Sequence, residues 1–178
     1  MKVLLHTCCA NCAIVPLRRL REAGLQLSGF FYNPNIHPYQ EYLRRKDTLE
    51  TYAQGAGLDI MYANEYDLEE FLRGVAFREH ERCRYCYHSR LEATAQMAKR
   101  EGFDAFTTTL LYSRHQNHLL IKEMGENLGE RISVPFYYED FRKWWQEGVN
   151  ESKAMGLYRQ HYCGCIYSEK ERYWRKGK

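Results

Sequence analysis

The sequence predicts an α/β fold built on a parallel sheet with helices on both faces. Short apolar segments rich in strand-forming residues alternate with longer amphipathic segments, the pattern of repeated strand–helix units. Glycines and one Asn-Pro-Asn turn separate the segments. The 178 residues contain 44% hydrophobic side chains, which suffices for one ordinary core. We therefore expect a single domain over 1–178, with a C-terminal extension of helix and loop that carries cysteines.

The first half of the chain contains three predicted strands. Residues 2–6 are a short β-rich run, and residues 13–23 place apolar side chains on one helical face with arginines opposite. Gly24 ends this helix, and the apolar run 25–32 stops at Asn33-Pro34-Asn35. A charged helical pattern over 39–54 then leads through two glycines to a third strand at 58–63.

The second half contains three predicted helices and two strands. Residues 67–77 open with Asp67, a preferred helix N-cap, and the longer helical pattern 84–101 stops at Gly102. Residues 104–111 are a β run, 117–128 are helical and 132–136 are apolar again. In such sheets ligands bind beyond the carboxyl ends of the strands.

The composition excludes several classes of protein. With 28% charged residues, 4 Pro and 12 Gly, the chain is unlike disordered or collagen-like sequence. No apolar run reaches the roughly 20 residues of a membrane span, and the N-terminus turns polar too soon for a signal peptide. We expect a cytoplasmic protein that does not contact a membrane.

Positive charge gathers at the C-terminal end. Residues 142–178 contain nine Lys or Arg and four Asp or Glu, a local charge of +5 that leaves −2 for the rest. The basic tail, about 166–178, includes Tyr173-Trp174-Arg175-Lys176, where aromatic and basic residues alternate. This pattern suits a nucleic-acid backbone with a base to stack on, and a solvated tail is the alternative.

Seven cysteines fall in three local sets, namely Cys8, Cys9 and Cys12, then Cys83 and Cys86, then Cys163 and Cys165. An odd number in a reducing compartment disfavours a disulfide framework and favours metal or redox chemistry over simple buried thiols. The first set follows the first strand, where an α/β fold places its active site.

Three kinds of cysteine chemistry remain open from the residues alone. A structural zinc site takes four ligands, and an iron–sulfur cluster could take Cys8 and Cys9 with Cys83 and Cys86. A thioredoxin-like dithiol would leave five cysteines unused. Adjacent cysteines are unusual in zinc knuckles, which favours the cluster. The Cys163-Gly164-Cys165 pair can instead close a strained, redox-active disulfide.

Several histidines are candidates for general acids, because imidazole titrates near neutral pH. They are His6, His88, His115, His118 and His161. His6 precedes the first cysteines and could bond to a metal ligand or donate a proton, or it could be an ordinary core histidine.

Five motifs in order over about 1–168 resemble the QueH type of epoxyqueuosine reductase. They are His6-Thr7-Cys8-Cys9-Ala10-Asn11-Cys12, the segment Tyr32-Asn33-Pro34-Asn35-Ile36-His37-Pro38 with Glu41-Tyr42, Cys83-x-x-Cys86, Thr107-Thr108-Thr109-Leu110-Leu111 with Ser113 and Gln116, and Tyr158-Arg159-Gln160-x-Tyr162-Cys163-Gly164-Cys165 with Ser168.

The resemblance implies a Rossmann-like domain of the HUP type. It also implies an activity, the last step of queuosine synthesis, in which epoxyqueuosine at the tRNA wobble position is reduced. It implies a 4Fe–4S cluster held by Cys8, Cys9, Cys83 and Cys86, and a redox-active pair, Cys163 and Cys165. Cys12 is unmatched, and Asn11 stands where the family commonly has Pro. The family has been associated with a second metal, so Cys12 is a candidate ligand of an additional iron.

The implied reaction removes one oxygen as water and consumes two electrons and two protons. An external donor such as a ferredoxin or flavodoxin is therefore an expected partner, together with the tRNA anticodon stem-loop. The candidate substrate-binding residues are Asn33, Asn35, His37, Thr108, Ser113 and Gln116. The candidate phosphate-binding residues are Arg18, Arg19, Arg44, Arg45, Arg159 and the tail 170–176, although each arginine alone is more typical of a solvated helix face.

Two other functions compete with this interpretation. A nucleotide-dependent HUP-type tRNA-modifying enzyme would place a Gly- or Ser-rich phosphate loop where this chain has Cys8-Cys9-Ala10-Asn11-Cys12. A zinc-stabilised RNA-binding module would be colourless and would leave the Cys163 and Cys165 pair without a role.

Overall fold

The computed structural model describes residues 1–63 and 66–174 and contains the predicted parallel sheet. Its four strands are β1 (Lys2–His6), β2 (Gln26–Phe31), β3 (Ile60–Tyr62) and β4 (Ala105–Thr108), in the order β3-β2-β1-β4. β1 is central, with Val3 opposite Leu27 on one side and Ala105 on the other. The chain reverses its direction of travel across the sheet between β1 and β4, which creates a crevice at their carboxyl ends.

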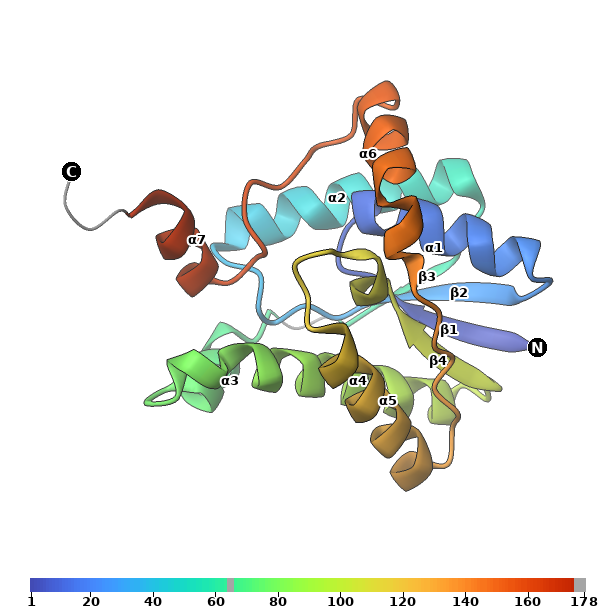
Figure 1. Ribbon diagram of the computed structural model, residues 1–178, viewed down its shortest axis with the longest axis horizontal. Helices are drawn as coiled ribbons and strands as arrows, with labels where there is room; N and C mark the ends of the chain where they lie inside the picture. Colours follow the sequence, from blue (N-terminus) through green and yellow to red (C-terminus); the bar gives the residue numbers. More distant parts are fainter. Residues whose placement is uncertain (64–65, 175–178) are drawn as a thin grey trace.

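Helices cover both faces of the sheet (Figure 1). One face carries α1 (Ala10–Glu22), α2 (Tyr39–Ala56) and α6 (Trp145–Ala154). The other carries α3 (Leu68–Val75), α4 (Arg82–Arg100) and α5 (His118–Ile132). α7 (Ile166–Tyr173) lies at the side of the sheet, and 3₁₀ turns lie at η1 (Glu79–Glu81), η2 (Thr109–Tyr112) and η3 (Phe141–Trp144). The fold class predicted from the sequence is therefore confirmed.

The core lies between the sheet and these helices. Leu4 and Leu5 of β1, Phe106 of β4, and Leu91 of α4 have no exposed surface. Hydrophobic burial on both faces of β1 explains why its sequence is a continuous apolar run rather than an alternating one.

Most element boundaries differ by a few residues from the sequence-based expectation, and three differences matter for the site. α1 begins at Ala10 rather than at 13, which brings Cys12 into its first turn. β4 ends at Thr108, because the Thr108 hydroxyl accepts a hydrogen bond from Leu110 N at 3.1 Å and starts the η2 turn. β3 covers only Ile60–Tyr62.

The predicted strand at 132–136 is wrong. α5 continues to Ile132, and the following segment joins the sheet only through a single parallel bridge between Phe106 and Phe136. Gly129 lets this segment pass close to the helix, since a Cβ there would lie 2.9 Å from the Val134 carbonyl oxygen. Apolar residues here pack against α5 instead of extending the sheet.

The C-terminal part of the chain returns over the carboxyl edge of the sheet between α6 and α7 (Figure 1). Asn11 at the start of α1 donates a hydrogen bond to the Tyr158 carbonyl at 2.8 Å and so ties this returning segment, residues 158–165, to the crevice. Arg175 and Lys176, part of the predicted basic tail, lie outside the described residues. Within the described part of the chain, no helix combines the length and apolarity that crossing a membrane requires.

Substituting Gly148 with Ala is expected to destabilise the fold by about 1–3 kcal/mol, the usual cost of overpacking. An added Cβ would lie 2.4 Å from the Tyr112 hydroxyl and 2.9 Å from Val15 Cγ2, so α6 would have to move away from α1. Urea denaturation measures the change. Gly55→Ala in α2 is the control, because nothing lies within 4 Å of its Cβ, and it should raise stability by about 0.5–1 kcal/mol. Equal stability of the two variants would contradict this packing.

Candidate active site

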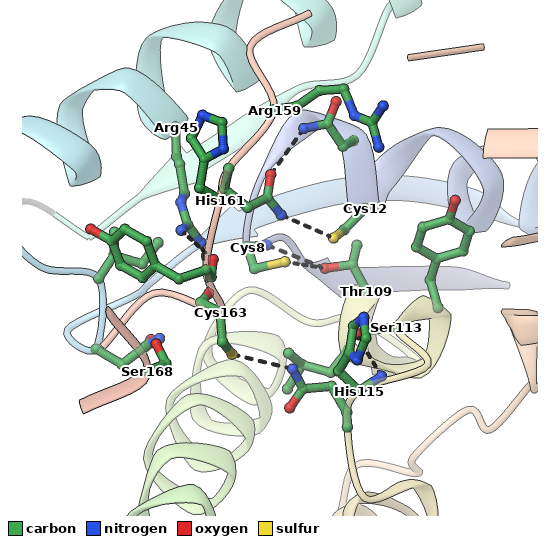
Figure 2. Close-up of a pocket in the computed structure, with 18 of the residues that line it drawn as sticks. Cys8, Cys12, Arg45, Thr109, Ser113, His115, Arg159, His161, Cys163 and Ser168 are labelled. Atoms are coloured by element: carbon green, nitrogen blue, oxygen red, sulfur yellow. Dashed lines mark hydrogen bonds between the residues drawn. The ribbon is translucent and has the colours of Figure 1, made fainter. Parts of the chain in front are cut away.

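A cavity of about 520 Å³ opens at the carboxyl edge of the sheet. Its walls come from the loop after β1, η2, α6, α7 and the returning segment. Figure 2 shows the Cys8, Cys12 and Cys163 side chains facing this cavity. Its cysteine and charged residues, with two histidines, are Cys8, Cys12, Arg45, Arg90, His115, Arg159, His161, Cys163, Glu171 and Arg172. The first and third cysteine sets therefore meet in the crevice that the topology predicts.

Cys8, Cys9 and Cys12 form a compact thiol group at the start of α1. Their Sγ atoms all lie within 4.8 Å of one another, and those of Cys8 and Cys9 are 3.9 Å apart. Cys9 is the N-cap of α1 and Cys12 lies in its first turn, where the partial positive charge of the helix terminus favours negative charge on sulfur. Three sulfur ligands at this spacing suit a soft metal centre.

Two polar side chains donate hydrogen bonds to this thiol group. Gln160 Nε2 lies 3.3 Å from Cys9 Sγ and 3.9 Å from Cys12 Sγ, and Thr109 Oγ1 lies 3.4 Å from Cys8 Sγ. Asn11 Nδ2 donates to Gln160 Oε1 at 3.0 Å and fixes the amide. Such contacts orient metal ligands.

Cys8 and Cys12 differ in pKa. Hydrogen bonds from the Cys12 and Cys9 thiols hold the pKa of Cys8 well below its usual range. The pKa of Cys12 is raised, because its thiol is the donor to Cys8 and Cys9 and because it is buried. Negative charge in the metal-free group is therefore centred on Cys8, and binding a metal ion would release the remaining thiol protons.

The second cysteine set lies in the first two turns of α4. Cys83 is exposed and Cys86 is buried. Burial, with smaller contributions from negative charge on Cys163 and Cys165, raises the pKa of Cys86 to about 12, whereas Arg90 opposes the shift. Arg90 Nη2 donates to Cys86 Sγ at 2.9 Å from one helical turn further on. The second and third sets are therefore electrostatic neighbours.

Cys163 and Cys165 are free thiols that point to different surroundings. Cys163 lines the cavity and accepts a hydrogen bond from Gln116 Nε2 at 3.3 Å. Cys165 is the N-cap of α7, accepts from Ser168 N at 3.4 Å and packs in one apolar cluster with Cys86. Gly164 between them is required by close approach, because a Cβ would lie 3.2 Å from Asn35 Nδ2 and 3.3 Å from Arg45 Nη1, and its φ is +153°.

Arg45 is buried, unlike the solvated or phosphate-binding side chain expected from its helical pattern. Its Nε donates to Glu41 Oε1 at 2.7 Å, while Nη1 and Nη2 donate to the carbonyls of Cys163 and Tyr162 at 2.8 and 3.0 Å. The other Glu41 oxygen accepts from the Tyr158 hydroxyl at 2.5 Å. This ion pair therefore anchors the returning segment above the thiol groups.

The other predicted phosphate-binding arginines differ in what their guanidinium groups contact. Arg18 forms ion pairs with Glu147 and Glu151, and Arg19 pairs with Glu22 while lying over the Trp144 ring. Arg44 lies over the Tyr158 ring. Arg159 lines the cavity, together with Arg172 of the tail.

Three of the predicted substrate-binding residues line the cavity, namely Asn35, Ser113 and Gln116. The buried Asn35 Oδ1 has no hydrogen-bond partner, which leaves an acceptor for a ligand. The other three have partners inside the fold. Asn33 donates to the Thr7 carbonyl, His37 bonds to the Pro34 carbonyl and Ile166 N, and Thr108 bonds to His6 and Leu110 N. Their predicted contact with substrate remains untested.

His6 is a satisfied core histidine. Its Nδ1 lies 3.0 Å from Thr108 Oγ1 and its Nε2 lies 3.1 Å from the Tyr32 carbonyl oxygen. Burial, with the nearby Arg90 charge, lowers the pKa of His6 to about 4, so the ring is neutral and links the ends of β1, β2 and β4. The histidines that line the cavity are His115 and His161, both exposed.

Sequence reasoning missed four residues that support the sulfur atoms, namely Asn11, Arg90, Thr109 and Gln160. For Arg90 a signal existed, since it follows Cys86 by four residues and therefore lies on the same helical face. For Gln160 no local signal existed, because its contacts to Cys9 and Cys12 span about 150 positions of sequence.

Comparisons with known proteins identify relatives over nearly the whole chain. The family model described as Epoxyqueuosine reductase QueH matches residues 3–171. The protein of that name from Thermotoga maritima is 38% identical over 180 residues, covering 96% of this chain and 91% of the relative. The one from Dehalococcoides mccartyi is 36% identical over 172 residues, covering 97% and 94%.

Solved structures share the fold at low sequence identity. The U34-tRNA thiolase NcsA from Methanococcus maripaludis, solved with its [4Fe-4S] cluster, superposes with a TM-score of 0.65 at 15% identity, over 94% of this chain and 61% of that one. A predicted tRNA methyltransferase subunit from Methanocaldococcus jannaschii gives a TM-score of 0.58 at 12% identity, over 86% and 74%. These likenesses show the shared fold, a parallel α/β sheet with flanking helices.

Replacing Arg45 with Met is expected to lower the free energy of unfolding by about 3–5 kcal/mol, because Glu41 stays buried without its cation. The double variant Glu41→Leu/Arg45→Met should recover most of this loss, since the buried charge is gone. In both variants the carbonyls of Tyr162 and Cys163 lack their donors.

Urea denaturation measures the stability, and hydrogen exchange measures the returning segment. We expect fast exchange of the amides in residues 160–166 in both variants, even where stability recovers. Native-like protection of these amides in the double variant would show that Arg45 does not anchor the segment.

Proposed function

The chain belongs to the QueH family of epoxyqueuosine reductases, and we propose that it reduces the epoxide of epoxyqueuosine at the wobble position of tRNA to the alkene of queuosine. The observation that carries this proposal is the gathering of thiols from separate sets at one substrate-sized cavity in a chain that matches the family from residue 3 to 171. The reaction takes up two electrons and two protons and releases the epoxide oxygen as water. We place this activity in the cytoplasm, with a ferredoxin or flavodoxin as the electron donor.

The donor set fits an iron–sulfur cofactor. We propose that Cys8, Cys9, Cys83 and Cys86 hold a 4Fe–4S cluster and that Cys12 binds an additional iron. The spacing of Cys8, Cys9 and Cys12 within 4.8 Å and the hydrogen bonds to their sulfurs support a metal at this place. When bound, the cluster would carry electrons from the external donor toward the site.

The Cys163 and Cys165 pair matches the stoichiometry of the reaction. Oxidation of two thiols to a disulfide gives up two electrons and two protons, the same number that reductive removal of the epoxide oxygen consumes. Cys163 faces the cavity and Cys165 lies one residue beyond Gly164. We propose that this dithiol is the redox-active pair and that the external donor returns it to the reduced state.

Polar groups of the cavity suit the modified base. Asn35 offers its unpartnered Oδ1 to a hydroxyl donor, and Ser113 and Gln116 line the same cavity. Gln116 Oε1 accepts from the Tyr87 hydroxyl at 2.7 Å, which fixes the amide while Nε2 contacts Cys163. We propose that Asn35, Ser113 and Gln116 orient the hydroxylated ring against the Cys163 thiol.

The rim of the cavity suits an RNA backbone. Arg159 and Arg172 line it and form no ion pair in the described part of the chain, whereas Glu171, its one acidic residue, is bound by Arg82. Trp145 lines the cavity under the Arg114 guanidinium at 4.5 Å. Cations on a rim with an aromatic platform bind phosphates and an unstacked base of an anticodon loop.

The proposed function is tested with protein purified without oxygen. About four irons and four sulfides per chain are expected for the cluster, and a fifth iron would support the role of Cys12. With dithionite and tRNA that carries epoxyqueuosine, nucleoside mass analysis should show the loss of one oxygen atom. One zinc, no colour and no conversion would overturn the proposal.

Cys163→Ser and Cys165→Ser should each lower this turnover by about 100-fold, the scale of losing a group from the chemical step, while iron content stays unchanged. Cys8→Ser is the contrasting variant and should lose iron. Turnover of the Cys163 and Cys165 variants at the original rate would remove the dithiol from the reaction.

Arg159→Ala and Arg172→Ala should each weaken binding of an unmodified anticodon stem-loop and reduce the dependence of log Kd on log salt concentration by about 0.7–0.9 per lost phosphate contact. Fluorescence anisotropy at several salt concentrations measures both. Lys99→Ala, at the far end of α4, is the control. An unchanged salt slope in both arginine variants would contradict the rim as the RNA contact.

A further inference from the structure

We propose that Arg90 is a positioning residue for the sulfur site, whose buried positive charge stabilises negative charge on sulfur and thereby raises the reduction potential of the group that the cysteines hold. The part of the proposal that concerns a bound iron–sulfur group rests on the proposed function. The part that concerns the free thiols rests only on Arg90 and its surroundings.

The first observation is the burial of Arg90 without a carboxylate partner. Only 2% of its surface is exposed. Its Nε donates to the Cys86 carbonyl at 3.0 Å and its Nη2 to Cys86 Sγ at 2.9 Å, and within the described residues no Asp or Glu forms an ion pair with it. A buried guanidinium is costly unless an anion compensates its charge.

The second observation is a comparison within the same chain. Arg45 is equally buried, and it forms an i,i+4 pair with Glu41 in α2. Arg90 forms the same i,i+4 pair in α4, with Cys86 in the position of the carboxylate. Both helices therefore pair a buried arginine with a group one helical turn earlier. In α2 this group is the Glu41 carboxylate, and in α4 it is the Cys86 sulfur.

The third observation is the position of Arg90 among the three cysteine sets. The guanidinium contacts Cys86 Sγ at 2.9 Å and lines the cavity that Cys8 and Cys163 also line, so it faces one cysteine from each set. In a buried site of low dielectric constant such a charge is weakly screened. Adding an electron makes the sulfur-bound group more negative, so a fixed cation favours the reduced form, as hydrogen bonds and charge near cluster sulfurs do in general.

The test compares Arg90→Met, Arg90→Gln and Arg90→Lys with the original protein. Redox titration of the iron-loaded proteins should give lower midpoint potentials for the Met and Gln variants, with the Lys variant closer to the original because it keeps the charge. Arg84→Met is the matched control, since Arg84 is exposed in the same turn as Cys86, and solvent should screen its charge.

A second readout needs no cofactor. In the metal-free protein, the ratio of the alkylation rates of Cys163 by anionic iodoacetate and neutral iodoacetamide should fall several-fold in Arg90→Met and stay near the original in Arg90→Lys and Arg84→Met. The ratio cancels the reactivity of the thiol and reports the positive charge that faces the cavity. Circular dichroism confirms folding. If the original protein binds no iron, the proposed function is contradicted, and the alkylation result alone tests the role of Arg90. An unchanged alkylation ratio in Arg90→Met, or equal potentials of all variants, would overturn the proposal.

Discussion

The buried ion pair between Glu41 and Arg45 holds the site together. The sheet alone brings the first cysteine set to the end of β1, but the third set arrives on the returning segment, which has no sheet partner of its own. Arg45 donates hydrogen bonds to two consecutive carbonyls of that segment. Glu41 neutralises the charge of Arg45 and accepts a hydrogen bond from the Tyr158 hydroxyl. Gln160 and Cys163 then occupy fixed positions over the thiols. A buried ion pair adds little net stability, and here it is better understood as fixing the position of a loop.

Helix termini explain where the cysteines lie. Cys9 is the N-cap of α1, Cys83 is the second residue of α4, and Cys165 is the N-cap of α7. At α7 the Ser168 N–H donates to Cys165 Sγ at 3.4 Å, and at each terminus the partial positive charge of the helix favours negative charge on a nearby sulfur. Together with the buried guanidinium groups, these termini would compensate negative charge on the sulfurs, which an apolar crevice could not hold. The chain therefore places cysteines at helix termini of the kind that hold phosphates in nucleotide-binding α/β proteins.

The sequence predicted the architecture because its signals are local. Apolar runs and glycine stops defined the strands, and the position of Cys8 after β1 located the site. The error at 132–136 arose because an apolar run packs as well against a helix as in a sheet. Asn33, His37 and Thr108 carry suitable polar groups, but only tertiary contacts reveal that the fold itself uses these groups. The role of Arg45 was hidden for the same reason, since a charged residue on a helix is usually solvated. For Arg90 only its spacing of four residues from Cys86 indicated a contact.

The returning segment also gives the site an order of assembly. Translation proceeds from β1 onward, and all four strands with the first two cysteine sets are made before residues 158–165. Until that segment is released, Arg45 lacks its carbonyl partners and the thiols at the start of α1 lie open on one side. The segment that covers the site is therefore synthesised after the residues that it covers. Until the returning segment folds, these thiols can therefore be reached from that side without the folded sheet having to open.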